Sequence, residues 1–265
     1  MADFAKQDRP RALRLPAGFG SRLRDDVQRL VEDLLGALPA AFQSDEYRRR
    51  LQEIQDEFKQ REESVAADVS RRAAEQDIVL LSTPNGYTLA ASRKGKVLDQ
   101  SEFEALGESE KERLQQAMDT LRQELRAALG RVPLWQRELR QRIRDLDADV
   151  TRLTVTQLLH ELEPAYQELP EVLAYLNAMC TDVVGNGALF RADGDGEIPS
   201  PDSPRFTRYR VNLLVDNGDT NGAPVVFEDN PNYQNLVGRI EHVAHMGTLS
   251  TDFTLIRPGV LHRAN

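Results

Sequence analysis

One repeat of apolar residues constrains the fold of this chain more than any other feature. Its members are Leu114, Met118, Leu121, Leu125, Ala128, Val132, Trp135, Leu139, Ile143, Leu146, Val150 and Leu153. Their spacing alternates between three and four residues, with one additional step of four, which is a heptad seam with a stutter. Pro133 lies inside the seam and predicts a kink or a helix break. A long helix that packs against a second helix is therefore expected here.

Two earlier segments supply partner helices. The stretch from Gly18 to Leu38 has an amphipathic pattern that should end before Pro39, and Ser44 is a candidate N-cap for the next helix. The apolar stripe of that next helix comprises Tyr47, Leu51, Ile54, Phe58, Val65 and Val69. Arg61 interrupts this stripe, and its aliphatic stem can lie along the apolar surface.

Between the helices the hydrophobic period changes to that of short strands. Ile78 to Leu81 and Tyr87 to Ala90 flank the turn signal Pro84-Asn85-Gly86. A small β-element near residues 77–98, at the far end of an antiparallel helical hairpin, fits this order. An arm of roughly 30 residues reaches about 45 Å at 1.5 Å per residue.

In the last third of the chain, the sequence pattern changes from long helices to short elements and loops. A short helix is expected from Val172 to Met179, followed by a loop over residues 191–205 that is rich in Gly, Asp, Ser and Pro. Strands are expected at residues 209–215, 224–227 and 253–256, with a helix over residues 235–244. The predicted fold is therefore mainly α, with long antiparallel coiled-coil-like arms and a small α/β part.

Composition and charge limit the possible partners and compartments. The net charge of −9 gives no reason to expect nucleic-acid binding. Aromatic residues at 6% argue against a sandwich or barrel. The N-terminus has no signal-peptide pattern and no apolar run is long enough to span a bilayer, so no membrane contact and a cytoplasmic location are expected. The single cysteine, Cys180, lies in an apolar run and is expected to be a buried structural thiol.

No self-sufficient catalytic site is evident from the residues. His242 and His245 would lie three apart on the predicted helix, but no third metal ligand or H-E-x-x-H frame accompanies them. Ordinary surface or interface histidines are the simpler interpretation, and His160 is expected to be structural. Asp193 to Glu197 resembles part of a calcium loop without its full ligand spacing. Phosphate-loop, G-x-S-x-G and Ser–Lys protease patterns are not recognisable, so we expect no catalytic, cofactor-binding or metal residue.

Several blocks of sequence closely resemble the Lon-related AAA+ proteases, the bacterial LonB- and LonC-like branch. They are NPNYQNLVGRIEHVAHMGTLSTDFTLIRPGVLHRAN, RVNLLVDN, PVVFEDNPNYQNL and the N-terminal RPRALRLPAG. In that family, H-R-A-N is typically followed by a strand with a Walker B-like acidic residue. The resemblance implies AAA+ core segments at 1–17 and 206–265, with a helical insertion at 18–190 and a flexible loop at 191–205.

The resemblance also implies what a longer parent protein would do. The parent would be a Lon-like serine endopeptidase, ATP-dependent where its ATPase is intact, that forms a homo-oligomeric ring and degrades unfolded proteins. ATP and magnesium are then expected for the parent and not for these 265 residues. The chain would be a non-catalytic fragment, downstream of the phosphate loop and without the protease domain.

Within that family the segment before the Walker B-like strand commonly carries inserts that face the central pore. Tyr233, Met246 and Phe253 are the candidate substrate contacts, because apolar contacts grip unfolded chains without sequence specificity. Core packing of these three side chains is the competing interpretation. The rival function is a helical module for oligomerisation or adaptor docking that makes no substrate contact.

Overall fold

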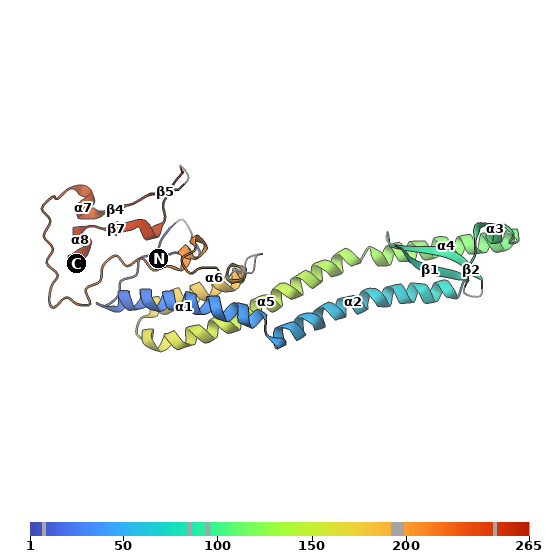
Figure 1. Cartoon of the computed structure of the whole chain (residues 1–265), viewed down its shortest axis with the longest axis horizontal. Helices are drawn as coiled ribbons and strands as arrows, with labels where there is room; N and C mark the ends of the chain where they lie inside the picture. The colour runs from blue at the N-terminus through green and yellow to red at the C-terminus, as the bar shows by residue number, and fades with distance from the viewer. Residues whose placement is uncertain (7–8, 84–85, 94–95, 192–198, 246–247, 265) are drawn as a thin grey trace. The chain divides into compact units, whose positions relative to one another are not determined.

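The computed structural model describes residues 1–264 except 7–8, 84–85, 94–95, 192–198 and 246–247. The chain divides into two compact units, one formed by residues 1–47 with 147–265 and the other by residues 48–146. The described residues form mainly helices with small antiparallel sheets, which confirms the predicted fold class (Figure 1). Residues 1–47 with 147–265 are called the terminal unit, and residues 48–146 are called the central unit.

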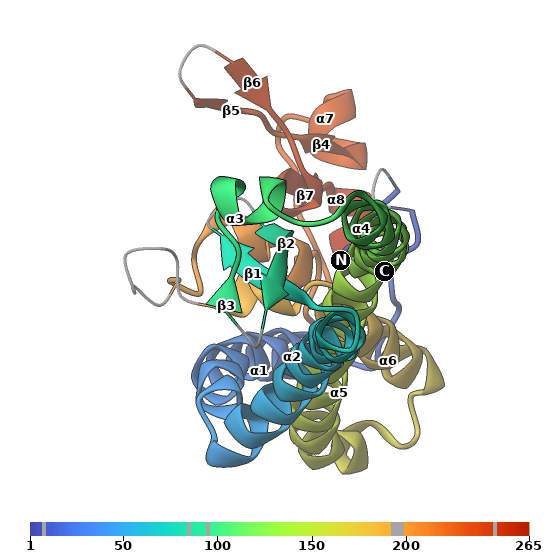
Figure 2. The same cartoon turned by 90° about the vertical axis from the view of Figure 1, so that its right-hand side faces the viewer.

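Three helices build the core of the terminal unit. α1 (Phe19–Phe42), the second half of α5 (Val132–Leu162) and α6 (Pro170–Gly185) lie side by side in both views (Figures 1 and 2). The short 3-10 helices η1 (Glu163–Tyr166), η2 (Gly187–Phe190) and η3 (Pro204–Tyr209) close this core with aromatic side chains. The predicted helix over 172–179 is confirmed and is longer at both ends.

The predicted end of α1 before Pro39 is wrong, because the helix continues to Phe42. Pro39 removes one hydrogen bond to the preceding turn and its ring crowds that turn, yet α1 continues for three residues beyond it. The Gln43 N–H bonds back to the Pro39 and Ala40 carbonyls, and Phe42 packs edge-on against Tyr47 at 5.2 Å. The last turn is therefore held by its own hydrogen bonds and by an aromatic contact.

Three tyrosine–aspartate–arginine clusters connect the segments of the terminal unit. The Tyr166 hydroxyl donates to Asp26 at 2.6 Å, the Tyr209 hydroxyl to Asp182 at 2.8 Å and the Tyr47 hydroxyl to Asp147 at 2.7 Å. Each aspartate also pairs with an arginine, which is Arg29, Arg208 or Arg191 respectively. Each carboxylate thus receives at least two donors, as a group withdrawn from water requires.

The tyrosine clusters predict a loss of stability in alkali. Burial and the hydrogen bond to Asp147 raise the pKa of Tyr47 to about 12, and burial with the bonds to Asp26 and Asp182 raises the pKa of Tyr166 and Tyr209. The folded state keeps these protons at a pH where the unfolded chain, with tyrosine pKa values of about 10, loses them. Their contribution is complete below pH about 10 and declines as pH rises through the folded values.

The measurement is urea unfolding from pH 8 to 11.5, followed by circular dichroism. Stability should fall above pH about 10, and a Tyr47→Phe variant should show a shallower fall over the same range. Equal slopes for the two proteins would contradict a role for Tyr47.

The central unit is an antiparallel helical pair, as predicted. α2 (Asp45–Ala74) starts at its predicted cap, since the Tyr47 N–H donates to the Ser44 hydroxyl at 3.2 Å. α4 (Glu108–Leu129) and the first half of α5 run antiparallel to α2. Three ion pairs show this, because the residue number on α2 increases from pair to pair while the number on its partner decreases. They are Glu57–Arg142, Arg61–Glu138 and Arg72–Glu124. Solvent-exposed pairs of this kind stabilise weakly and mainly specify register.

The two helices that carry the predicted seam are present, and Leu114, Leu121, Leu125 and Leu146 are its buried members. α4 ends at Leu129 and α5 begins at Val132, so the predicted break lies just before Pro133. The final member, Leu153, was wrongly predicted as buried and is 73% exposed. The buried face of α5 moves to Thr151, Val155 and Leu159, because there the helix joins the core of the terminal unit and no longer packs on one partner.

Arg61 occupies the apolar stripe of α2 in the manner expected of a long cationic side chain. Its guanidinium lies over the Phe58 ring at 4.9 Å and over the Trp135 ring at 5.9 Å, and it pairs with Glu138 at 3.1 Å. The stem therefore covers apolar surface while the charge is compensated by α5.

The predicted β-element is a three-stranded antiparallel sheet. β1 (Ile78–Thr83) pairs with β2 (Gly86–Arg93) from Ile78↔Ala91 to Thr83↔Gly86, and β2 continues to β3 (Lys96–Val97). α3 (Gln100–Glu104) follows with a capping box between Asp99 and Glu102. Ile78 and Ala91 pack on Leu114 and Leu121 of α4, so one sheet face completes a small core.

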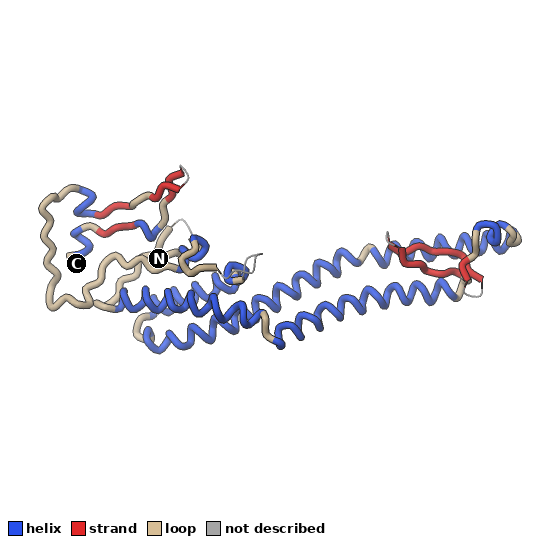
Figure 3. The backbone as a smooth tube through the Cα atoms, in the orientation of Figure 1, coloured by secondary structure: helices blue, strands red, loops and turns tan. Residues whose placement is uncertain are grey.

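The predicted strands and helix of the last third are mostly wrong. Residues 210–216 and 224–227 are extended without a strand partner, and they lie in the tan segment that precedes α7 in Figure 3. The observed elements are α7 (Tyr233–Val237), β4 (Gly238–Ile240), β5 (Val243–His245), β6 (Thr248–Ser250), η4 (Phe253–Leu255), β7 (Ile256–Pro258) and α8 (Val260–Arg263). The helix predicted over 235–244 ends at Val237, because Gly238 adopts a φ of 104° that a helix does not allow.

Candidate functional site

The C-terminal elements form a small module around one backbone crossing. β4 pairs with β7 through Gly238↔Pro258, Arg239↔Arg257 and Ile240↔Ile256. A Cβ placed on Gly259 would lie 2.2 Å from the Leu236 carbonyl oxygen, and one on Gly238 would lie 2.5 Å from the Arg257 carbonyl oxygen. Only glycine allows backbones to approach so closely. α7 and α8 therefore lie next to each other at the same end of the strand pair (Figure 1).

Polar side chains connect this module to the rest of the terminal unit. Glu241 accepts hydrogen bonds from Arg257 at 2.8 Å and from Arg239 at 2.9 Å, and these bonds lower the pKa of its carboxyl group. The Asn212 amide donates to the carbonyl oxygens of Phe253 at 2.8 Å and Ile256 at 3.0 Å. The module is therefore attached to the extended segment 210–216.

The same extended segment is attached to the start of α1. Asp216 accepts the N–H groups of Gly18 and Gly218, both at 3.1 Å, and its hydrogen bonds with Ser21 and these amides lower its pKa. The two glycines allow close contact, since a Cβ on Gly218 would lie 3.0 Å from the Cα of Gly18. One segment thus bridges the N-terminal helix and the C-terminal module.

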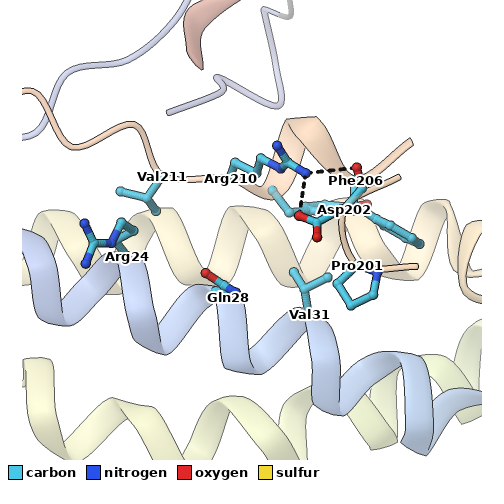
Figure 4. A pocket seen from close by; sticks show the side chains of 9 residues that line it. Arg24, Gln28, Val31, Pro201, Asp202, Phe206, Arg210 and Val211 are labelled. Carbon is cyan, nitrogen blue, oxygen red and sulfur yellow. Dashed lines mark hydrogen bonds and ion pairs between the residues drawn. The ribbon is translucent and has the colours of Figure 1, made fainter. Parts of the chain in front are cut away.

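Two hollows result from this arrangement. The larger, of about 680 Å³, is lined by residues 10–17, residues 211–217, Phe253, Ile256 and His262. The smaller, of about 210 Å³, lies between α1 and η3 and includes Arg24, Gln28 and Val31 on the helix side (Figure 4). Its Arg210 donates to Asp202 at 3.1 Å, and Arg24 pairs with Asp25 at 2.8 Å, so both cations are compensated.

The structure places two of the three candidate substrate contacts, Tyr233 and Phe253, in different surroundings. Tyr233 is the first residue of α7 and is 76% exposed. Phe253 is half-buried in η4 and lines the larger hollow, so it does not share the surface position of Tyr233. Met246 lies outside the described residues.

The histidine and cysteine candidates do not form a metal centre among the described residues. His242 precedes β5 and His245 ends it, so the predicted helical spacing does not occur. His160 is exposed on α5 and contacts Glu163 at 2.9 Å. Within the described ranges, no group of three or more His, Cys, Asp or Glu side chains could hold a metal ion. Cys180 is half-buried, and burial raises the pKa of its thiol. The Asp193–Glu197 segment lies outside the described residues.

Sequence reasoning missed the most exposed apolar side chains. Val225 is 93% exposed and Phe227 is 89% exposed, although residues 224–227 were predicted to form a strand. A sequence alone gives no signal for the absence of a strand partner. None of the helices in the described part of the chain is long and apolar enough to cross a membrane.

Two family models match the ends of this chain. Residues 1–30 match the Lon-like LonC helical domain, and residues 221–265 match the LonB-like AAA domain. No curated protein matches the chain. The first match includes residues 1–17, which we attributed to the AAA+ core, and the domain boundaries stay a prediction. These matches, at both ends of the chain, confirm its resemblance to the Lon-related AAA+ proteases.

Proposed function

We propose that this chain captures or gates unfolded polypeptide for a Lon-like ATP-dependent serine protease and contributes to assembly of its homo-oligomeric ring. The observation that carries the proposal is the exposed Tyr233 within the AAA-domain match. Its side chain stands on an ordered turn, because the Asn232 side chain accepts the Asn235 N–H at 2.9 Å and the Asn235 amide donates to the Asn230 carbonyl at 3.0 Å. An aromatic side chain has few rotatable bonds, so on an ordered turn it can bind apolar chain with a small loss of entropy.

More apolar surface lies beside Tyr233 in sequence. Ile240, Val243 and Leu249 of the β4 to β6 region are each at least half exposed. Apolar contacts are non-directional, so such a surface accepts many unfolded sequences. The helical arm of the central unit would hold or gate the captured chain.

We propose that catalysis takes place in other parts of the parent protein, outside these 265 residues. The 265 residues contain no phosphate-cradling G-x-x-x-x-G-K-[ST] motif, so we assign no nucleotide contact to them. ATP and magnesium would act in the parent. The cytoplasmic location stays a prediction from the sequence.

The test is binding of fluorescently labelled, denatured casein to the 265-residue chain, followed by anisotropy. Tyr233→Ser should weaken binding about tenfold, since a partly buried aromatic side chain contributes on the order of 1–2 kcal/mol. Leu153→Ser is the matched control, because Leu153 is similarly exposed but lies on α5, outside both family matches. Equal affinities for wild type and Tyr233→Ser would exclude the proposed role of Tyr233.

The role of the arm needs the full-length parent enzyme. Deleting residues 48–146 should slow the degradation of unfolded casein while cleavage of a short peptide is retained. Casein degradation at the wild-type rate would remove the arm from the proposal.

A second candidate function is an oligomerisation or adaptor-docking module without substrate contact. It is favoured by the central unit, where the only large apolar side chains that are clearly exposed among the described residues are Tyr87, Val97 and Leu134. Sedimentation of the chain with and without denatured casein distinguishes the two functions, because a docking module would sediment identically in both.

A further inference from the structure

Residues 224–227, with the sequence Pro-Val-Val-Phe, have the properties of a strand that lacks its sheet. Val225 and Phe227 are almost fully exposed. Within the described residues, no backbone–backbone hydrogen bond involves residues 224–229. Extended β-branched and aromatic sequence with free backbone donors and acceptors is a template for pairing with another chain.

The larger hollow of the terminal unit has the complementary properties. Leu13, Leu15, Leu213 and Phe253 are among its apolar walls, and its volume of about 680 Å³ exceeds that of a valine and a phenylalanine side chain together. One wall, residues 211–216, is itself extended and takes part in no backbone–backbone hydrogen bond within the described chain. A strand laid along this wall would supply the missing bonds and cover the apolar side chains.

The charges at the two surfaces also match. Arg11 and Arg14 line the hollow and form no ion pair among the described residues. The apolar residues 224–227 are followed directly by Glu228 and Asp229. Asp229 is exposed, and Glu228 uses one carboxylate oxygen on Asn230 and Asn235. A docked strand would bring this acidic pair toward the two arginines.

We propose that residues 224–227 of one copy of this chain lie as an extended strand in the larger hollow of a second copy. Val225 and Phe227 would contact the apolar walls, and residues 211–216 would provide the backbone partner. The two surfaces are different patches of the same chain, so the contact is head-to-tail, which generates rings or open chains of copies. The inference rests on the proposed self-assembly and names the segment that makes it.

Sedimentation equilibrium of the 265-residue chain, without casein, tests the proposal. Wild type should associate with increasing concentration, and a Val225→Asp/Phe227→Asp variant should weaken that association at least about 100-fold, because two buried apolar anchors are replaced by charges. Leu153→Asp, at another exposed apolar position, on α5, should associate as wild type. Circular dichroism checks that each variant retains its helices.

Mixing two variants makes the test specific. Arg11→Glu/Arg14→Glu alters the hollow only, and Val225→Asp/Phe227→Asp alters the strand only. Each should be impaired alone, whereas the mixture should form a pair of twice the 29.9 kDa chain mass that does not grow further. Association that is insensitive to both variants would overturn the named contact but leave self-assembly standing. A wild-type chain that remains monomeric throughout would overturn both the contact and the self-assembly, without bearing on casein binding.

Discussion

Gly259→Ala is expected to separate the strand pair β4–β7 and release α7 from α8. The new methyl carbon would lie 2.2 Å from the carbonyl oxygen of Leu236, 2.4 Å from its carbonyl carbon and 2.5 Å from the nitrogen of Gly238. All three are backbone atoms, so no side-chain rotation can relieve the overlap. The cost should be about 3 kcal/mol or more, at the upper end of overpacking effects.

The stability available in this module is small. β4 and β7 have three residues each and α8 has four, and a two-stranded ribbon is marginal in water. We therefore expect complete local opening without unfolding of the helical core. Amide hydrogen exchange in residues 238–258 and tryptic cleavage after Arg239 should both become faster.

The control is Gly36→Ala. Gly36 lies inside α1, and a Cβ there would meet nothing within 4 Å. This substitution should be neutral or stabilising by about 0.5–1 kcal/mol, since alanine favours helix over glycine. If Gly259→Ala behaved like Gly36→Ala, the close backbone crossing would be disproved.

The sequence predicts the helices well because their signal is repeated many times. The seam from Leu114 to Val150 carries one apolar residue per turn, and a single exception does not change its period. The β1–β2 hairpin is predictable for a related reason, since two short apolar runs flank a turn signal in the local sequence. The two strands of the hairpin also lie close together in the sequence.

The last third is less predictable because a strand is defined by its partner. Residues 224–227 have the composition of a strand, yet the described chain places no second strand beside them. The helix predicted over 235–244 follows an apolar pattern that Gly238 interrupts with a positive φ. Among the site residues, Tyr233 is exposed at the start of α7, next to the cap at Asn232, and its role as a substrate contact stays a prediction.

Asp26 is the residue whose importance sequence reasoning overlooked. It lies on the apolar face of α1, between Leu23 and Leu30, and only 5% of its surface is exposed. An acidic residue within an apolar stripe is the signal that was available, because a buried carboxylate requires donors from another element. Here the donor from outside α1 is Tyr166, which is 140 positions away in sequence.

Tyr166→Phe should therefore destabilise the terminal unit by about 1.5–3 kcal/mol, the range for removing a hydrogen bond to a buried charge. The Tyr166 hydroxyl lies 2.6 Å from Asp26, and Arg22 stacks over its ring at 5.8 Å. The phenylalanine ring keeps the packing and the cation–π contact, so the loss reports the hydroxyl alone. Tyr233→Phe is the control, since the Tyr233 hydroxyl has no hydrogen bond among the described residues.

The measurement must report the terminal unit. Trp135, the only tryptophan, lies in the central unit, so its fluorescence would follow the wrong transition. Amide hydrogen exchange in α1 and α6 under native conditions gives the opening free energy of the helices that share this core. Protection there should fall about 10- to 150-fold in Tyr166→Phe.

A double substitution separates the charge from the hydroxyl. Asp26→Leu/Tyr166→Phe removes both polar groups and leaves an apolar contact of similar size, so it should cost less than the sum of the two single substitutions. The reason is that Tyr166→Phe is costly only while the Asp26 carboxylate remains buried and deprived of a donor. Strictly additive costs would show that the hydroxyl and the carboxylate do not interact, and that aromatic packing alone joins η1 to α1.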